Sequence, residues 1–198
     1  MALRNTPLRY GTVAASFHWI IAAFILFQLW LGLYMVSLPH SDPSAFGYVQ
    51  LHKSIGLTIL VLSVGRLLWR LVNRVPPLPK RMNIVLRGIA HLSHFFLYVL
   101  IIGIPLSGWA MTSASPLGLP IKYFGLFDWP KIWFLADMTR EQKRPLGHML
   151  GDVHMYLAFS LIGLLVIHVC GALYHQFILR DTVLKRMIPG THVEEEAA

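Results

Sequence analysis

The strongest constraint on the fold is a set of four apolar stretches, each long enough to cross a bilayer. They cover about residues 13–36, 50–72, 88–112 and 148–179. A membrane crossing takes about 20 mainly apolar residues, and a single segment in hydrocarbon satisfies its own backbone hydrogen bonds as an α-helix. The sequence therefore predicts an all-α fold, an integral membrane four-helix bundle formed by residues 1–198 as a single domain.

The composition agrees with lipid as the solvent. Hydrophobic residues make up 56% of the chain and charged residues 13%, whereas soluble domains average about 45–50% and about 25%. A soluble enzyme, a disordered chain and a secreted disulfide-bonded domain are all poor fits. Cys170 is the single cysteine, so there is neither an internal disulfide nor a C-x-x-C-H motif for covalent haem attachment.

Prolines mark the three connections between the stretches, Pro145 among them, and Pro105 is expected to kink the third helix. The third connection, residues 113–147, is the longest. Aromatic residues are dense in it, which is typical of a segment that lies in a membrane interface. They are Tyr123, Phe124, Phe127, Trp129, Trp133 and Phe134.

The basic residues predict the orientation, because cytoplasmic loops carry an excess of Lys and Arg. Eleven fall on one side: Arg4, Arg9, Arg66, Arg70, Arg74, Lys80, Arg81, Arg87, Arg180, Lys185 and Arg186. Six fall on the other side: Lys53, Lys122, Lys131, Arg140, Lys143 and Arg144. Both termini are therefore expected in the cytoplasm, with the third connection outside. We attribute the net charge of +8 to basic residues that orient and anchor the membrane helices. Nucleic acid is therefore not expected as a partner.

Histidines inside the apolar stretches are the main functional signal, because ionisable groups within a membrane are costly. His154 and His168 are 14 residues apart on one predicted helix, which places them on one stripe about 21 Å apart along the axis. On the predicted topology His52 shares the outer depth of His154, and His18 shares the inner depth of His168. The four histidines therefore form two pairs, one in each leaflet.

Two facing imidazoles suit the two axial positions of a haem iron. Zinc is an alternative, although it prefers four ligands, often with Cys or carboxylate among them. Neither pair offers more than two histidines, and no carboxylate inside the membrane accompanies His18, His52 or His168. Polar contacts between helices are a third explanation. The hypothesis that we carry forward is two haems, each with two histidine ligands.

Other residues are candidates for contacts with the haem or with a quinone. Arg66 follows His52 by 14 residues, so it could pair with a propionate of the inner haem, or it could be an arginine whose head reaches the membrane surface. His91, His94 and His175 lie near the inner pair and could bind propionates or a quinone head group, or could be interfacial polar residues. His148 lies off the stripe, while His40 and His192 are expected in solvent.

With these residues in place the chain resembles the bacterial cytochrome b561 family, four-helix di-haem proteins related to the membrane cytochromes of Ni–Fe hydrogenases. The matching motifs begin at Ser16-Phe17-His18-Trp19, Leu51-His52-Lys53-Ser54, Ala90-His91-Leu92-Ser93-His94 and Asp152-Val153-His154. The resemblance implies two non-covalent b-type haems, with His52 and His154 on the outer iron and His18 and His168 on the inner one. It also implies a quinone as the electron acceptor.

Two electron-transfer functions follow from the resemblance. One branch of the family oxidises superoxide and reduces ubiquinone, and the cluster Arg140, Lys143 and Arg144 could attract that anion. The alternative is an electron-relay subunit that serves a periplasmic dehydrogenase or hydrogenase. A haem-free scaffold or transporter is the third class. Localisation in a bacterial inner membrane is expected in each case.

Overall fold

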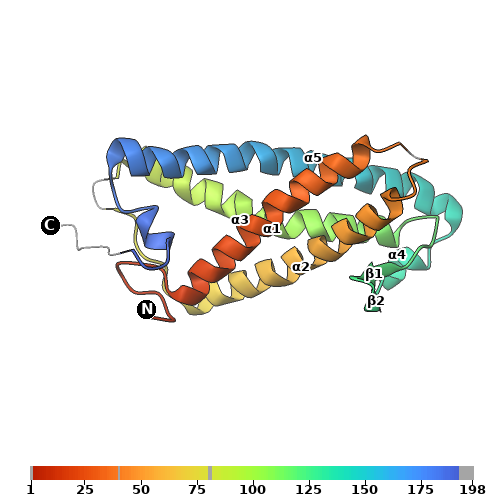
Figure 1. Ribbon diagram of the computed structural model, residues 1–198, viewed down its shortest axis with the longest axis horizontal. Helices are drawn as coiled ribbons and strands as arrows, with labels where there is room; N and C mark the ends of the chain where they lie inside the picture. The colour runs from red at the N-terminus through yellow and green to blue at the C-terminus, as the bar shows by residue number, and fades with distance from the viewer. Residues whose placement is uncertain (1, 40, 80–81, 192–198) are drawn as a thin grey trace.

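The computed structural model describes residues 2–39, 41–79 and 82–191. Most of them belong to four long helices that lie lengthwise beside one another (Figure 1). The helices are α1 (Thr12–Ser37), α2 (Ala45–Val72), α3 (Ile84–Ser113) and α5 (Arg140–Tyr174). Each is long and apolar enough to cross a membrane, which confirms the predicted four-helix membrane bundle.

Short elements define the two ends of the bundle. Strands β1 (Ile121–Tyr123) and β2 (Phe127–Trp129) and the short helix α4 (Trp133–Ala136) lie between α3 and α5. We call this the hairpin end. A π-helix (His175–Leu179) continues α5, and a 3-10 helix (Lys185–Met187) follows it at the opposite end. We call that the terminal end, because the N-terminal segment also lies there (Figure 1).

Large apolar side chains cover the outside of the bundle. Ile84 is 82% exposed and Leu26 is 65% exposed, which would be unfavourable in water but costs nothing against lipid tails. The buried core is small and lies around the middle of the bundle. Its members are Ile21, Ile25, Leu31, Ile55, Ile59, Leu100, Ile101 and Leu161.

Helix α5 begins at Arg140, eight residues earlier than the predicted start at 148. The prediction that Pro145 lies in the third connection is therefore wrong, since this proline is inside the helix. A capping box explains the early start: the Thr139 hydroxyl accepts from the Gln142 backbone N–H, and the Gln142 side chain accepts from the Thr139 N–H. This cap satisfies two terminal N–H groups, which offsets the bond that the proline cannot make.

The four helices do not pack equally. Helix α1 packs along α2, α2 along α3, and α3 along α5. Among the described residues, α5 has no comparably close packing with α1 or α2. The backbone of α5 is therefore further from α1 and α2 than from α3, and the predicted histidine pairs face each other across this wider separation.

The hairpin is fastened to the side of α2. The Ser54 hydroxyl donates to the Lys122 carbonyl at 3.0 Å and accepts from the Phe124 N–H at 2.9 Å. Deeper along α2, the Thr58 and Tyr123 hydroxyls lie 3.0 Å apart. The turn needs two left-handed residues, Phe124 (φ 49°) and Gly125 (φ 74°), as a type I′ turn does. The part of the third connection that forms the hairpin is thus ordered and packs along the side of α2 at Ser54 and Thr58.

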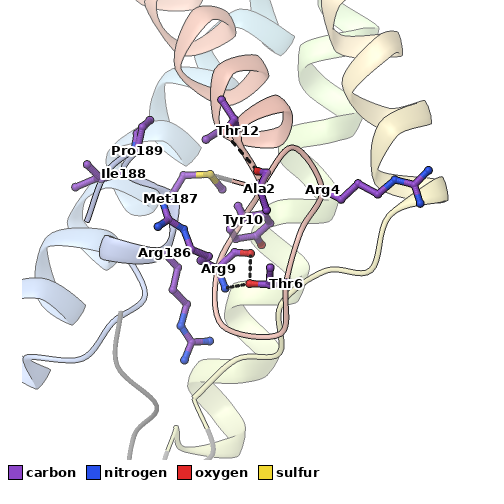
Figure 2. Close-up of a pocket in the computed structure, with 12 residues that line it drawn as sticks. Ala2, Arg4, Thr6, Arg9, Tyr10, Thr12, Arg186, Met187, Ile188 and Pro189 are labelled. Carbon is purple, nitrogen blue, oxygen red and sulfur yellow. Dashed lines mark hydrogen bonds between the residues drawn. The ribbon is translucent and has the colours of Figure 1, made fainter. Parts of the chain in front are cut away.

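At the terminal end, three chain segments are joined by hydrogen bonds. The Trp19 indole donates to the Met187 carbonyl at 3.0 Å, and the Arg186 guanidinium donates to the Pro77 carbonyl at 2.6 Å. Figure 2 shows a pocket between the N-terminal segment and residues 186–189, but at about 10 Å³ it has room for no more than a water molecule. Burial there raises the pKa of the Tyr10 phenol. This end is a closed cap on the bundle.

Candidate functional site

At the hairpin end, His52 of α2 and His154 of α5 face each other. Their ring centres are 6.2 Å apart, and the rings are inclined at 74°. Nδ1 of His154 lies 3.0 Å from the Ile104 carbonyl oxygen and 2.9 Å from the Ser107 hydroxyl. Because a carbonyl oxygen only accepts, Nδ1 carries the hydrogen, which leaves Nε2 free for a metal.

At the terminal end, His18 of α1 faces His168 of α5. Their ring centres are 6.3 Å apart, and the rings are inclined at 61°. His94 of α3 is also close, with its ring centre 5.5 Å from that of His168. The structure therefore brings together the two predicted pairs, one toward each end of the bundle, and adds His94 to the second pair as a close neighbour.

The spacing within each pair can be compared with a bis-imidazole metal site. Two metal–nitrogen bonds of about 2 Å, with about 1.2 Å from each nitrogen to its ring centre, give ring centres about 6.4 Å apart. The observed 6.2 Å and 6.3 Å agree with this separation. The pairs therefore have the spacing that one iron between two imidazoles requires.

The hydrogen bonding of the histidines argues against simple polar contacts between helices. Among the described residues, the buried Nδ1 atoms of His18 and His52 have no hydrogen-bond partner. Two imidazoles that served only to join helices would be expected to bond to each other or to a neighbour. Among all the residues that the structure describes, no group of three His, Cys, Asp or Glu side chains could hold a metal ion by itself. Each pair supplies two ligands, which suits a macrocycle that brings the other four.

A cavity of about 500 Å³ lies beside His52 and His154. Its wall is almost entirely apolar, with residues from α1, α2, α3 and α5, and this volume is within the range of cofactor pockets, about 300–1,000 Å³. The residues present therefore fit a flat apolar macrocycle held between the two histidines. The cavity lies where α5 is separated from α1 and α2.

Two glycines make room for the histidine rings at this cavity. A Cβ atom on Gly32 would lie 3.2 Å from Cε1 of His52, and one on Gly108 would lie 3.1 Å from Cε1 of His154. Both distances are tighter than ordinary van der Waals contact. Sequence reasoning missed these residues. The available signal was only that each is a glycine inside a helix, where glycine is unfavourable without a packing reason.

The predicted candidate Arg66 lies near the terminal-end histidines. Its charge is close enough to act on His18, His94 and His168. The guanidinium carbons of Arg66 and Arg70 each lie 5.5 Å from the ring centre of Tyr98. Among the described residues neither arginine has a carboxylate within 4.0 Å. Both cations are therefore available to an anionic group.

The other histidines differ in their surroundings. Nδ1 of His175 lies 2.5 Å from a carboxylate oxygen of Asp181, and the second oxygen of Asp181 accepts from the Val183 N–H at 3.0 Å. Both side chains are largely buried. Sequence reasoning missed this partner, because a π-helix and a left-handed Arg180 turn the chain back between the two residues. His91 and His148 are exposed.

The basic cluster of the third connection is not in a loop. Arg140, Lys143 and Arg144 lie in the first turns of α5, and Nζ of Lys143 donates to the Ala136 carbonyl at 2.6 Å. None of the three lines the 500 Å³ cavity, whereas Lys53 does. The predictions for His40, Lys80, Arg81 and His192 fall outside the described residues.

Comparison with known proteins agrees with this arrangement. A family model described as prokaryotic cytochrome b561 matches residues 9–190. "Cytochrome b561 homolog 2" of Escherichia coli (strain K12) is 39% identical over 189 residues, 95% of this chain and 95% of that protein. "Probable superoxide oxidase CybB" of Yersinia pestis is 25% identical over 183 residues, 91% of this chain and 96% of that protein. Because the family match spans nearly all of the chain, the protein belongs to the prokaryotic cytochrome b561 family: it is a membrane electron-transfer protein, and its family implies haem of the b type.

Proposed function

We propose that the protein is a di-haem oxidoreductase that takes electrons from superoxide on the outer side of a bacterial inner membrane and delivers them to ubiquinone. The observation that carries this proposal is that two pairs of facing imidazoles lie toward opposite ends of one bundle. In each pair the ring centres are a little over 6 Å apart. A single pair would serve one face of the membrane, whereas two pairs offer a route across it.

In this proposal His52 and His154 ligate the outer haem iron, and His18 and His168 ligate the inner one. The haems, when bound, supply one-electron redox chemistry, and the chain supplies ligation, spacing and charge. The Ile104 carbonyl orients His154 through Nδ1. At the inner site Arg66, with no carboxylate partner among the described residues, is free to pair with a haem propionate.

The side of each reaction follows from the proposed orientation, with both termini cytoplasmic. Superoxide would be attracted at the hairpin end by Arg140, Lys143 and Arg144. Support for this donor comes from a relative that is named a probable superoxide oxidase, at 25% identity. The basic residues of the second connection and the terminal segments support the orientation.

The quinone would bind at the terminal end, near His94 and His175. His94 lies beside His168, so a quinone in contact with it would be close to the inner iron. His175 is oriented by Asp181, which suits a ring that holds a hydrogen bond or proton for the quinone head group. His94 on α3 and His175 after the end of α5 both lie at this end of the bundle.

A relay cytochrome that serves a periplasmic protein is the second candidate function. The observation in its favour is the exposed apolar tip of the hairpin, where Leu126 is 79% exposed and Phe124 and Phe127 about half exposed. Such a tip, rigidly fastened to α2 through Ser54, would suit a protein partner.

The test is the visible spectrum of the detergent-purified, oxidised protein before and during a steady supply of superoxide. We expect reduction of two b-type haems, abolished by superoxide dismutase and reversed by added ubiquinone. If the haems are present but are not reduced by superoxide, the superoxide function is wrong and the relay function is favoured. Protein without visible absorbance would overturn the reading of the histidine pairs.

A further inference from the structure

Lys53 is the one charged side chain among the described residues that line the 500 Å³ cavity. It follows His52 on α2, and together with His52 and Gly56 it belongs to the wall of the cavity. The side chain is half-buried. A cation in the wall of an apolar cavity is unfavourable unless an anion or a strong acceptor accompanies it.

The described residues provide no such partner. Among residues 2–39, 41–79 and 82–191, no carboxylate lies within 4.0 Å of the Lys53 ammonium, and the ammonium donates no hydrogen bond. The charge that acts on it is that of a second cation, Lys131, whose Nζ donates to the Gly118 carbonyl. By contrast, the exposed Lys122 has Asp128 at 3.9 Å. The edge of the cavity at Lys53 is therefore positive and lacks its counter-charge.

We infer that Lys53 binds a carboxylate of the group that fills this cavity, namely a propionate of the outer haem. The inference rests on the proposed function, because it requires a haem between His52 and His154. The volume favours a carboxylate at the edge of a large apolar ring, since a free diatomic anion would leave most of about 500 Å³ empty. The ammonium then anchors the macrocycle and places a positive charge near the iron, which favours the reduced form.

The experiment compares three variants of the full-length protein: Lys53→Met, which keeps the length of the side chain without its charge, Lys53→Arg, and Lys122→Met as the matched control. Haem loss is followed by transfer to excess apomyoglobin, and each haem is titrated for its reduction potential. We expect Lys53→Met to release one of its haems about tenfold faster, since a hydrogen bond to a charged group contributes at least about that factor.

In Lys53→Met the potential of the same haem should fall, because the positive charge that favours ferrous iron is gone. Lys53→Arg should restore both properties, and Lys122→Met should match the parent protein. Unchanged haem release and potential in Lys53→Met would overturn the inference while leaving two haems in place. A variant with normal haems and slower oxidation of superoxide would also overturn it, since the anion would then be superoxide. Parent protein that lacks one haem would refute the proposed function instead.

Discussion

At the scale of single residues, each predicted haem site depends on two imidazoles from different helices. His154 is held through Nδ1 by the Ile104 carbonyl and the Ser107 hydroxyl, so its ring direction is set before any metal binds. His18 and His52 lack such a bond among the described residues. The binding of iron would therefore fix their orientation more than that of His154.

His154→Ala is expected to remove one haem and leave the other. The two pairs share α5 but no ligand, and the second pair lies 14 residues further along that helix. The measurement is the haem-to-protein ratio of purified protein, which should fall by half, with one set of reduced-spectrum features lost. His148→Ala, on the same helix with an exposed side chain, is the control and should retain both haems. Two haems with unchanged spectra in His154→Ala would refute the ligand assignment.

At the scale of elements, small residues decide where a helix can approach a histidine ring. Helix α3 contains Gly103 and Gly108. A Cβ on Gly103 would meet nothing within 4 Å, whereas one on Gly108 would lie 3.1 Å from Cε1 of His154. Both positions lie inside the same helix and differ in what faces them, so they form a matched pair.

Gly108→Ala is expected to weaken haem binding at the hairpin-end pair, because the methyl group displaces the His154 ring by a few tenths of an ångström. Gly103→Ala should keep both haems and stabilise α3 by about 1 kcal/mol, the usual preference of a helix for alanine over glycine. Haem content after extensive washing and thermal unfolding distinguish the two variants. Equal haem retention in both would show that the contact at Gly108 does not matter for the site.

The residue at which a helix begins decides whether nearby basic side chains belong to that helix or to a loop. The early start of α5 turns Arg140, Lys143 and Arg144 from loop residues into residues of a helix. Lys143 is then occupied in bonding the Ala136 carbonyl. Lys53, by contrast, lies beside His52 within α2, as the predicted stretch 50–72 already had it. The cation nearest the cavity is therefore on α2 rather than on α5.

At the scale of the whole molecule, the distribution of basic residues predicts that the terminal end faces the cytoplasm. Cysteine labelling in intact cells tests this prediction. In a Cys170→Ser background, Lys122→Cys at the exposed hairpin should react with a membrane-impermeant maleimide, and Arg4→Cys should react only after the cells are broken open. Labelling of Arg4→Cys in intact cells, with protection of Lys122→Cys, would reverse the orientation and place the superoxide side at the other end.

The sequence alone was sufficient for the fold class and the pairing of the histidines. An apolar segment long enough to cross a bilayer must be helical, because lipid offers its backbone no hydrogen-bond partners. On any regular helix, a separation of 14 residues places His154 and His168 on nearly the same face, about 21 Å apart along the axis. Their partners His18 and His52 followed from the alternation of helix direction. These features are local or depend on simple periodicity, and the ring distances of 6.2 Å and 6.3 Å agree with them.

Contacts between segments remote in the sequence were decided only by the tertiary structure. The separation of α5 from α1 and α2, the cavity between them and the closeness of Gly108 to His154 depend on how whole helices pack. The pairing of His175 with Asp181 depends on a reversal of the chain after α5 that no periodic pattern encodes. Periodicity determines which face and depth a residue occupies, whereas the packing of one helix against another determines what that residue meets, and here it leaves Lys53 as the one charge on the cavity wall among the described residues.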